Sequence, residues 1–394
     1  MNAVQERLRS YGRTAPLAVA LVVLAFLLPQ YIESLGDIPL IGDFIPGLGN
    51  MVIMIVFTMM AVGLNIVVGY AGLLDLGYVA FYAAGAYTAA WFASQQFDQW
   101  TFHFGSVGIA QTVPGIHLSI WLVLLIAGVF TALAGILIGL PTLRLRGDYL
   151  AIVTLGFGEI VPQVVRNGDN VFGFDLTHGT FGISPIDSPG FGSIGDSLGL
   201  PLSYQQSFDR AQWFYWTALA LLLITVFCSI RLRDSRLGRA WIAIREDETA
   251  AAAMGVPLMR TKTWSYAIGA FFGGVAGAFY ASFKSGAFPS DFYFNISVFL
   301  LCMVILGGMG SIWGVILGGM ILGYLNVEGL ATLGSELQEA GIDFDPTKYQ
   351  FGFYGVIIVL MMLFRPEGLI PERRHKRELE LGVSDTPLYD ASHD

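Results

Sequence analysis

Apolar runs of about 20 residues recur along this 394-residue chain, and charged residues fall in short clusters between them. A helix of that length crosses the roughly 30 Å hydrocarbon layer of a bilayer. Glycine supports a membrane location. Its 48 occurrences would weaken soluble helices, whereas small residues let membrane helices pack closely. We therefore predict an all-α polytopic membrane protein.

Ten candidate spans follow from the apolar runs, with eight to ten crossings because 149–165 and 293–307 are short and could be tilted, broken or re-entrant. Two glycine-rich turns, Gly69–Gly72 and Gly307–Gly310, fall between spans and are a weak sign of duplicated halves. The predicted spans are 15–32, 51–69, 73–93, 119–140, 149–165, 212–230, 264–283, 293–307, 311–330 and 350–364.

Basic residues alternate between the connections, and basic loops remain in the cytoplasm. The segment 1–14 holds three arginines, 231–263 holds seven basic residues, and the tail 365–394 is basic at its start. The long connection 166–211 holds two arginines and five aspartates. We therefore predict both termini and 231–263 in the cytoplasm, 166–211 in the periplasm, and a single transmembrane domain over 15–364.

The N-terminus has two interpretations. Arg7, Arg9 and Arg13 precede the apolar run Ala15–Leu28, as in a signal peptide, and Ser34–Gly36 resembles a cleavage site. An uncleaved first helix is the favoured interpretation.

Several function classes find no support. Only four lysines occur, so nucleic-acid binding is not indicated, and Cys228 and Cys302 lie in apolar runs that imply no disulfide. Thr261 precedes Lys262 where an ATP-binding loop needs glycine. With no clustered metal ligands and no catalytic triad either, we predict a protein that is not an enzyme and binds no cofactor itself.

Four polar residues within or beside the spans are candidates for a translocation path: Asn65, Asp75, Glu159 and Asn295. For Asp75, the favoured alternative is a charge at a helix end near the membrane surface. For Glu159, the alternatives are a hydrogen bond inside the bundle and a tilted segment that reaches water.

The stretch REDETAAAAMG, Arg245–Gly255, interrupts the apolar pattern. Nine charged residues among 231–248 exclude a span there, since each costs roughly 2.5 to 3.5 kcal/mol at the bilayer centre. Asp247 is suited to cap a helix through Ala250–Ala253, which Gly255 would end.

That helix would have about seven residues, which is too short to be stable alone. Either another protein holds it in a groove or it packs on its own bundle. The upstream segment Arg239–Ile244, which includes Trp241, supplies apolar groups to anchor the loop at the membrane face.

Five passages together resemble the M-type permease subunits of branched-chain amino acid ABC importers. They are Gly63–Tyr87, Arg144–Ile160, Asp234–Val256, Val304–Gly318 and Arg365–Leu369. The resemblance implies a bacterial inner-membrane importer of Leu, Ile and Val that works by alternating access. It also implies an H-type partner permease, two ATPase subunits that bind ATP and Mg, and a periplasmic binding protein.

The resemblance further implies that the short helix docks on an ATPase subunit. Thr249 stands where the family motif has glutamate, and Glu248 lies one residue earlier. In addition, Thr177–Ile183 is similar to a family element, with His178 in place of a glycine; it is either a periplasmic contact or simply a turn. The coupling candidates are Arg239, Trp241, Glu246, Asp247, Glu248, Thr249, Ala250, Ala251 and Gly255.

Other functions remain open from the sequence. Importers of amides, urea or other amino acids share this permease type. An ion-coupled secondary transporter or a membrane scaffold is also compatible with the apolar runs.

Overall fold

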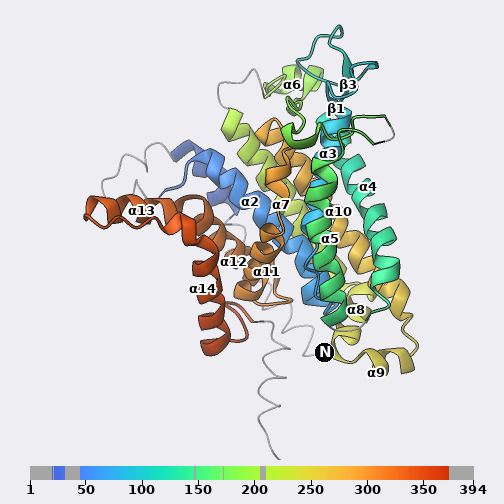
Figure 1. Ribbon diagram of the computed structural model, residues 1–394, viewed down its shortest axis with the longest axis vertical. Coiled ribbons are helices and arrows are strands. Elements are labelled where there is room, and N and C mark those ends of the chain that lie inside the picture. The colour runs from blue at the N-terminus through green and yellow to red at the C-terminus, as the bar shows by residue number, and fades with distance from the viewer. Residues whose placement is uncertain are drawn as a thin grey trace, which may run out of the picture.

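A computed structural model describes residues 20, 22–31, 45–145, 148–171, 173–204 and 210–371. Three helices form its centre: α2 (Leu48–Asn65), α3 (Val79–Phe92) and α10 (Leu258–Lys284). The helix α10 packs along α3 and α4 (Ile120–Thr142), and α2 packs against α7 (Arg210–Asp234) and other helices (Figure 1). The remaining α-helices are α5 Asp148–Arg166, α6 Gly192–Leu198, α8 Arg236–Glu246, α9 Glu248–Ala253, α11 Asn295–Gly307, α12 Ile312–Tyr324, α13 Leu330–Glu339 and α14 Gln350–Phe364. The short 3-10 and π segments are η2 Ile66–Tyr70, η3 Gly179–Phe181, η4 Pro289–Phe292, η5 Leu325–Gly329 and η6 Pro346–Tyr349.

Seven helical stretches in the described ranges are long and apolar enough to cross a membrane. Two apolar helices are shorter, Val22–Tyr31 and α11, and α3 has 14 residues. Each predicted span has a helix within its described residues, although several bounds differ, and seven helices rather than ten are long and apolar enough to cross. The stretch 149–165 is long enough, while 293–307 is not. The seven stretches are Leu48–Tyr70, Ile120–Thr142, Tyr149–Arg166, Arg210–Asp234, Leu258–Lys284, Ile312–Glu339 and Pro346–Phe364.

Glycines bring the central helices together. A Cβ at Gly85 of α3 would lie 2.1 Å from the carbonyl oxygen of Gly274 in α10. One at Gly277 would lie 2.0 Å from the carbonyl oxygen of Tyr82. Only glycine allows this separation between the two backbones, which is how small residues stabilise membrane helix pairs.

The predicted span 73–93 was wrong at its start, because α3 begins only at Val79. Residues 73–78 are irregular, and four of them are buried, whereas Leu74 is exposed and Leu76 half-buried. Their backbone is satisfied without helix: Asp75 Oδ1 accepts from the Gly77 amide at 2.9 Å, and Thr154 Oγ1 accepts from the Leu76 amide at 3.0 Å. Asp75 therefore does not lie at a helix end; it precedes α3 by four residues and is 1% exposed.

The all-α prediction also needs a correction. The connection 94–118 forms a small sheet with strand order β1-β3-β2. Strand β3 (Gly115–Leu118) pairs antiparallel with β1 (Ala93–Ser94) and parallel with β2 (Thr101–Phe104). Strand pairing satisfies backbone hydrogen-bonding groups of this connection without a helix.

The expected loop 331–349 was wrong as well, since helix continues from α12 through the π-turn η5 into α13. In η5, Glu328 Oε2 accepts from Asn50 Nδ2 at 2.5 Å. The helix α13 extends sideways from the bundle, and α14 turns away from it, packs against α11 and keeps most of its surface exposed (Figure 1).

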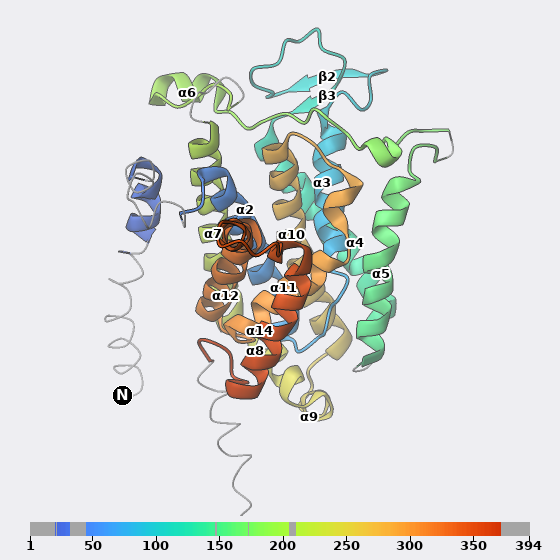
Figure 2. The ribbon, with the colours of Figure 1, turned by 60° about the vertical axis from the view of Figure 1, so that its left-hand side comes forward.

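The two ends of the bundle differ. The sheet and α6 lie at one end, here called the sheet end, and α9 lies at the other, here called the α9 end (Figure 2). Their opposite positions agree with the predicted placement of 166–211 and 231–263 on opposite sides of a membrane. Residues 1–19, the Ser34–Gly36 segment and the tail from 372 are outside the described residues.

Candidate functional site

The short helix α9 is confirmed with both of its predicted boundaries. Asp247 Oδ1 accepts from the amides of Thr249 at 2.7 Å and Ala250 at 3.0 Å. The Thr249 hydroxyl also donates to this carboxylate, and these bonds hold the pKa of Asp247 below its ordinary value. At the other end Gly255 is left-handed, with φ of 85°, and Val256 donates to the Ala251 carbonyl at 3.0 Å. This bond pattern is a glycine C-cap.

The helix α8 fixes this loop to the bundle, as expected from its apolar residues. Trp241 is fully buried, and its Nε1 donates to the Thr261 carbonyl of α10 at 2.8 Å. Ile244 is also buried. Arg239 and Glu246 lie exposed on the outer side.

Glu248 is turned toward its own chain. Its Oε1 lies 2.8 Å from Nζ of Lys262, whose side chain is only 4% exposed. No partner for Lys262 was predicted from the sequence, although a lysine at the start of an apolar helix needs one. This ion pair joins α9 to α10. Glu248 therefore faces inward, and other residues form the outer surface of α9.

That outer surface is small and nonpolar. Ala251 is buried against the bundle, whereas Met254 is 84% exposed. Five further residues of the turn face solvent: Thr249, Ala250, Ala252, Ala253 and Gly255.

A missed residue, Arg245, links this loop to the interior. Its Nη1 donates to the Gly69 carbonyl at 2.6 Å. Its stem covers Gly72, where an added Cβ would lie 2.8 Å from Arg245 Cγ. Its partner is 176 positions away along the chain, so no local pattern could indicate it.

The two glycine-rich turns meet beside this contact. Asn65 Oδ1 accepts from the Gly310 amide at 2.9 Å, and a Cβ at Gly69 would lie 2.6 Å from the same nitrogen. The passage Arg365–Leu369 also contacts this region, because the Leu369 amide donates to the Leu306 carbonyl at 2.9 Å. Four of the five passages behind the resemblance therefore converge near the α9 end.

The four candidate path residues do not form one cluster. Asn65 and Asp75 are buried, and the described contacts tie both to backbone amides. Asn295 is exposed at the start of α11. Glu159 is exposed on α5, where it lines an open groove of about 660 Å³.

At the sheet end, a buried pair holds the small sheet against the bundle. His117 Nδ1 lies 2.8 Å from Asp187 Oδ2, and the His103 ring stacks on His117 with centroids 4.9 Å apart. Ser282 of α10 donates to the Asp187 carbonyl at 2.7 Å. Burial raises the pKa of Asp187 to about 6, despite the lowering effect of the His117 bond.

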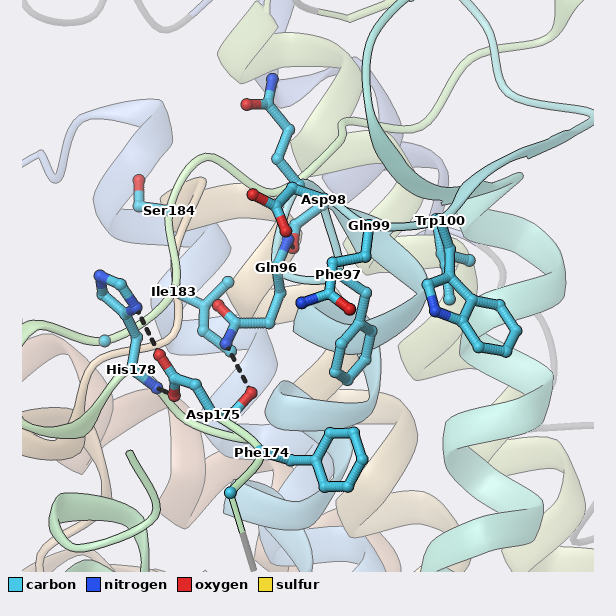
Figure 3. A pocket seen from close by; sticks show the side chains of 15 residues that line it. Gln96, Phe97, Asp98, Gln99, Trp100, Phe174, Asp175, His178, Ile183 and Ser184 are labelled. Atoms are coloured by element: carbon cyan, nitrogen blue, oxygen red, sulfur yellow. Dashed lines mark hydrogen bonds and ion pairs between the residues drawn. The ribbon is translucent and has the colours of Figure 1, made fainter. Parts of the chain in front are cut away.

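The Thr177–Ile183 element forms a tight turn beside a cavity of about 640 Å³ (Figure 3). His178 is left-handed, with φ of 57°, at the position where the family element has glycine. Asp175 stabilises it by accepting from the His178 amide at 2.7 Å, and His178 Nδ1 lies 2.9 Å from its other oxygen. In the described residues, no group of three or more His, Cys, Asp and Glu could hold a metal ion.

Spanning helices and a capped loop helix tied to the interior define a polytopic membrane protein. A family profile described as "Branched-chain amino acid transport system / permease component" matches residues 48–362. The chain is 37% identical over 380 residues to the high-affinity branched-chain amino acid transport system permease protein LivM of Escherichia coli. That alignment covers 93% of this chain and 77% of the relative.

Two further relatives are more distant. A probable branched-chain amino acid transport permease LivM of Methanocaldococcus jannaschii is 29% identical over 64% of this chain and 69% of its own. The high-affinity permease protein LivH of Escherichia coli is 29% identical over 43% of this chain and 50% of its own. No solved structure matches significantly. The chain belongs to the branched-chain amino acid transport permeases, and such permease components of ABC transport systems are not enzymes themselves.

Proposed function

We propose that this chain is one of two membrane-spanning subunits of an ATP-driven importer of Leu, Ile and Val in a bacterial inner membrane. The second subunit is an H-type permease, and the likeness to LivH supports such a related partner. Two ATPase subunits bind ATP and Mg, and a periplasmic binding protein delivers the amino acid. The observation that carries this proposal is the exposed helix α9, capped at both ends and joined to the interior through Arg245.

Under this proposal the α9 end lies in the cytoplasm, as the seven basic residues of 231–263 favour. The exposed groups of α9 contact an ATPase subunit, together with Arg239 and Glu246. Trp241, Glu248 and Ala251 hold α9 in position from the inner side, so the motif glutamate that Thr249 replaces is not needed for docking.

Alternating access follows from the connection of α9 to the interior. Closure of the ATPases moves α9 and α8, and Arg245 carries this motion to the Gly69 carbonyl. From there Asn65 reaches Gly310, so the ends of α2 and α11 move together. Coupling of this kind needs an element with two arrangements that both sites bias. Asp75 is buried and stabilises the helices around the substrate path, while the exposed Glu159 and Asn295 face that path.

The test is reconstitution of the complex in liposomes, purified through a tag on this chain. Leucine should accumulate only with ATP and a binding protein present. Uptake by this chain alone on an ion gradient, without ATP, would contradict the proposal and favour a secondary transporter. A complex that moves urea or amides but not leucine would contradict the proposed cargo.

A further inference from the structure

The helix α5 has an exposed face that differs from those of other outer helices. It lies at the edge of the bundle (Figure 2), and Ile152, Ile160 and Val164 on it are each more than half exposed. A Cβ added at Gly156 would have no atom within 4 Å. On its inner side α5 is fixed, since Thr154 bonds to the Leu76 amide.

Polar groups lie on this same open face. Glu159 and Gln163 lie on α5, and Asn167 directly follows its last residue. The three are spaced four residues apart and are all exposed, so they form one stripe. Together with Ile160, Val164 and Val171 they line the groove of about 660 Å³.

Glu159 lies too deep in the span for a surface charge. Glu159 is ten residues beyond Tyr149, the first residue of this span, which is about 15 Å along a helix and half of the hydrocarbon layer. A carboxylate at that depth faces a partner or a water-filled path, not lipid. By contrast, α4 and α14 carry no charged residue at all, and their exposed faces suit lipid tails.

The groove has the three kinds of group that a free aliphatic amino acid requires. A carboxylate accepts hydrogen bonds from an ammonium group, amide N–H groups donate to a carboxylate, and apolar side chains cover an aliphatic chain. Glu159 provides the carboxylate, and Ile160 with Val164 the apolar cover. Gln163 and Asn167 provide the amides, and Asn167 Nδ2 also donates to the Gln163 backbone carbonyl at 2.8 Å.

We infer that the α5 groove is one wall of the substrate path, that Glu159 binds the ammonium group of the amino acid there, and that the second permease subunit closes the groove. This inference rests on the proposed function. The groove is open on this chain because its opposite wall belongs to that subunit.

The first experiment measures ATP-driven leucine uptake by the reconstituted complex with Glu159→Gln and Glu159→Asp. Loss of the charge should lower uptake at non-saturating leucine by about tenfold or more, and Glu159→Asp should restore part of the uptake in an equally assembled complex. Wild-type uptake in an assembled Glu159→Gln complex would overturn the inference. Absence of uptake by the wild-type complex would instead overturn the proposed function.

The second experiment leaves Glu159 intact. It tests whether α5 faces the substrate path even if the Glu159→Gln complex fails to assemble. In a Cys228→Ser, Cys302→Ala background, Gln163→Cys should react with a charged methanethiosulfonate, and leucine with ATP should slow this reaction. The matched control is Leu137→Cys on α4, which is 74% exposed and should stay unlabelled. If Cys at 163 is as unreactive as Cys at 137 in every nucleotide state, α5 does not face the path.

Discussion

The helix α10 carries a different kind of structure at each of its ends. At the sheet end, Ser282 bonds to the Asp187 backbone, and the buried His117–Asp187 pair holds a sheet that covers the bundle. At the α9 end, Lys262 pairs with Glu248 and holds a short helix whose outer face stays exposed. One end is closed by its own chain, and the other presents a surface that is joined to the interior.

The largest expected effect is a difference in protein stability between a glycine-to-alanine substitution at the packed α9 end and one on the open α5 face. A Cβ at Gly69 would lie 2.6 Å from the backbone nitrogen of Gly310, which cannot move aside as a side chain can. Gly69→Ala should therefore destabilise the protein by about 3 kcal/mol. The matched control is Gly156→Ala on α5, where space is open and helix propensity should stabilise by about 0.5 to 1 kcal/mol. Thermal unfolding in detergent measures both, and equal losses would contradict the comparison.

The second expected effect concerns which partner protein binds at each end of the bundle. Met254→Asp on α9 should abolish co-purification of the ATPases, because it adds charge to an exposed nonpolar contact. Phe181→Asp at the sheet end, where Phe181 is 81% exposed, should keep the ATPases and weaken stimulation by the binding protein. Neither should change the stability of the chain by more than about 0.5 kcal/mol. ATPases retained by Met254→Asp would exclude α9 as their docking site.

The smallest expected effect concerns pH at the sheet end. The folded pKa of Asp187, about 6, lies above its ordinary value of 3.8, so the folded state favours the protonated form. Its contribution to stability is complete below pH 3.8 and is lost as pH rises through 6. The loss should stay below about 3 kcal/mol, since one pKa unit is worth about 1.4 kcal/mol and solvent reaches part of the group.

Thermal unfolding of the wild type and Asp187→Asn from pH 4 to pH 7 checks this. The wild type should lose stability relative to the variant over that interval. Parallel curves would mean that Asp187 does not titrate as its burial implies.

The features predicted from the sequence are those that depend on residues close together along the chain. Apolar run length located the helices, and Asp247, the alanines and Gly255 defined α9 with its boundaries. Long-range contacts could not be predicted in this way. Arg245 bonds to Gly69, which is distant in the sequence, and Glu248 turns to Lys262 on the next helix. Asp75 is buried in an irregular segment because several helices pack around it. The strands of 93–118 were missed because their pairing lies outside the apolar periodicity of the spans.

The contact between Arg245 and Gly69 is the central claim, since it connects the exposed α9 end to the helix interior. The most direct measurement is the number of leucine molecules transported per ATP hydrolysed by the Arg245→Ala complex, compared with wild type. We predict that the complex assembles and hydrolyses ATP while this ratio falls by about tenfold or more. A ratio equal to that of the wild type would show that motion reaches the spans by another route.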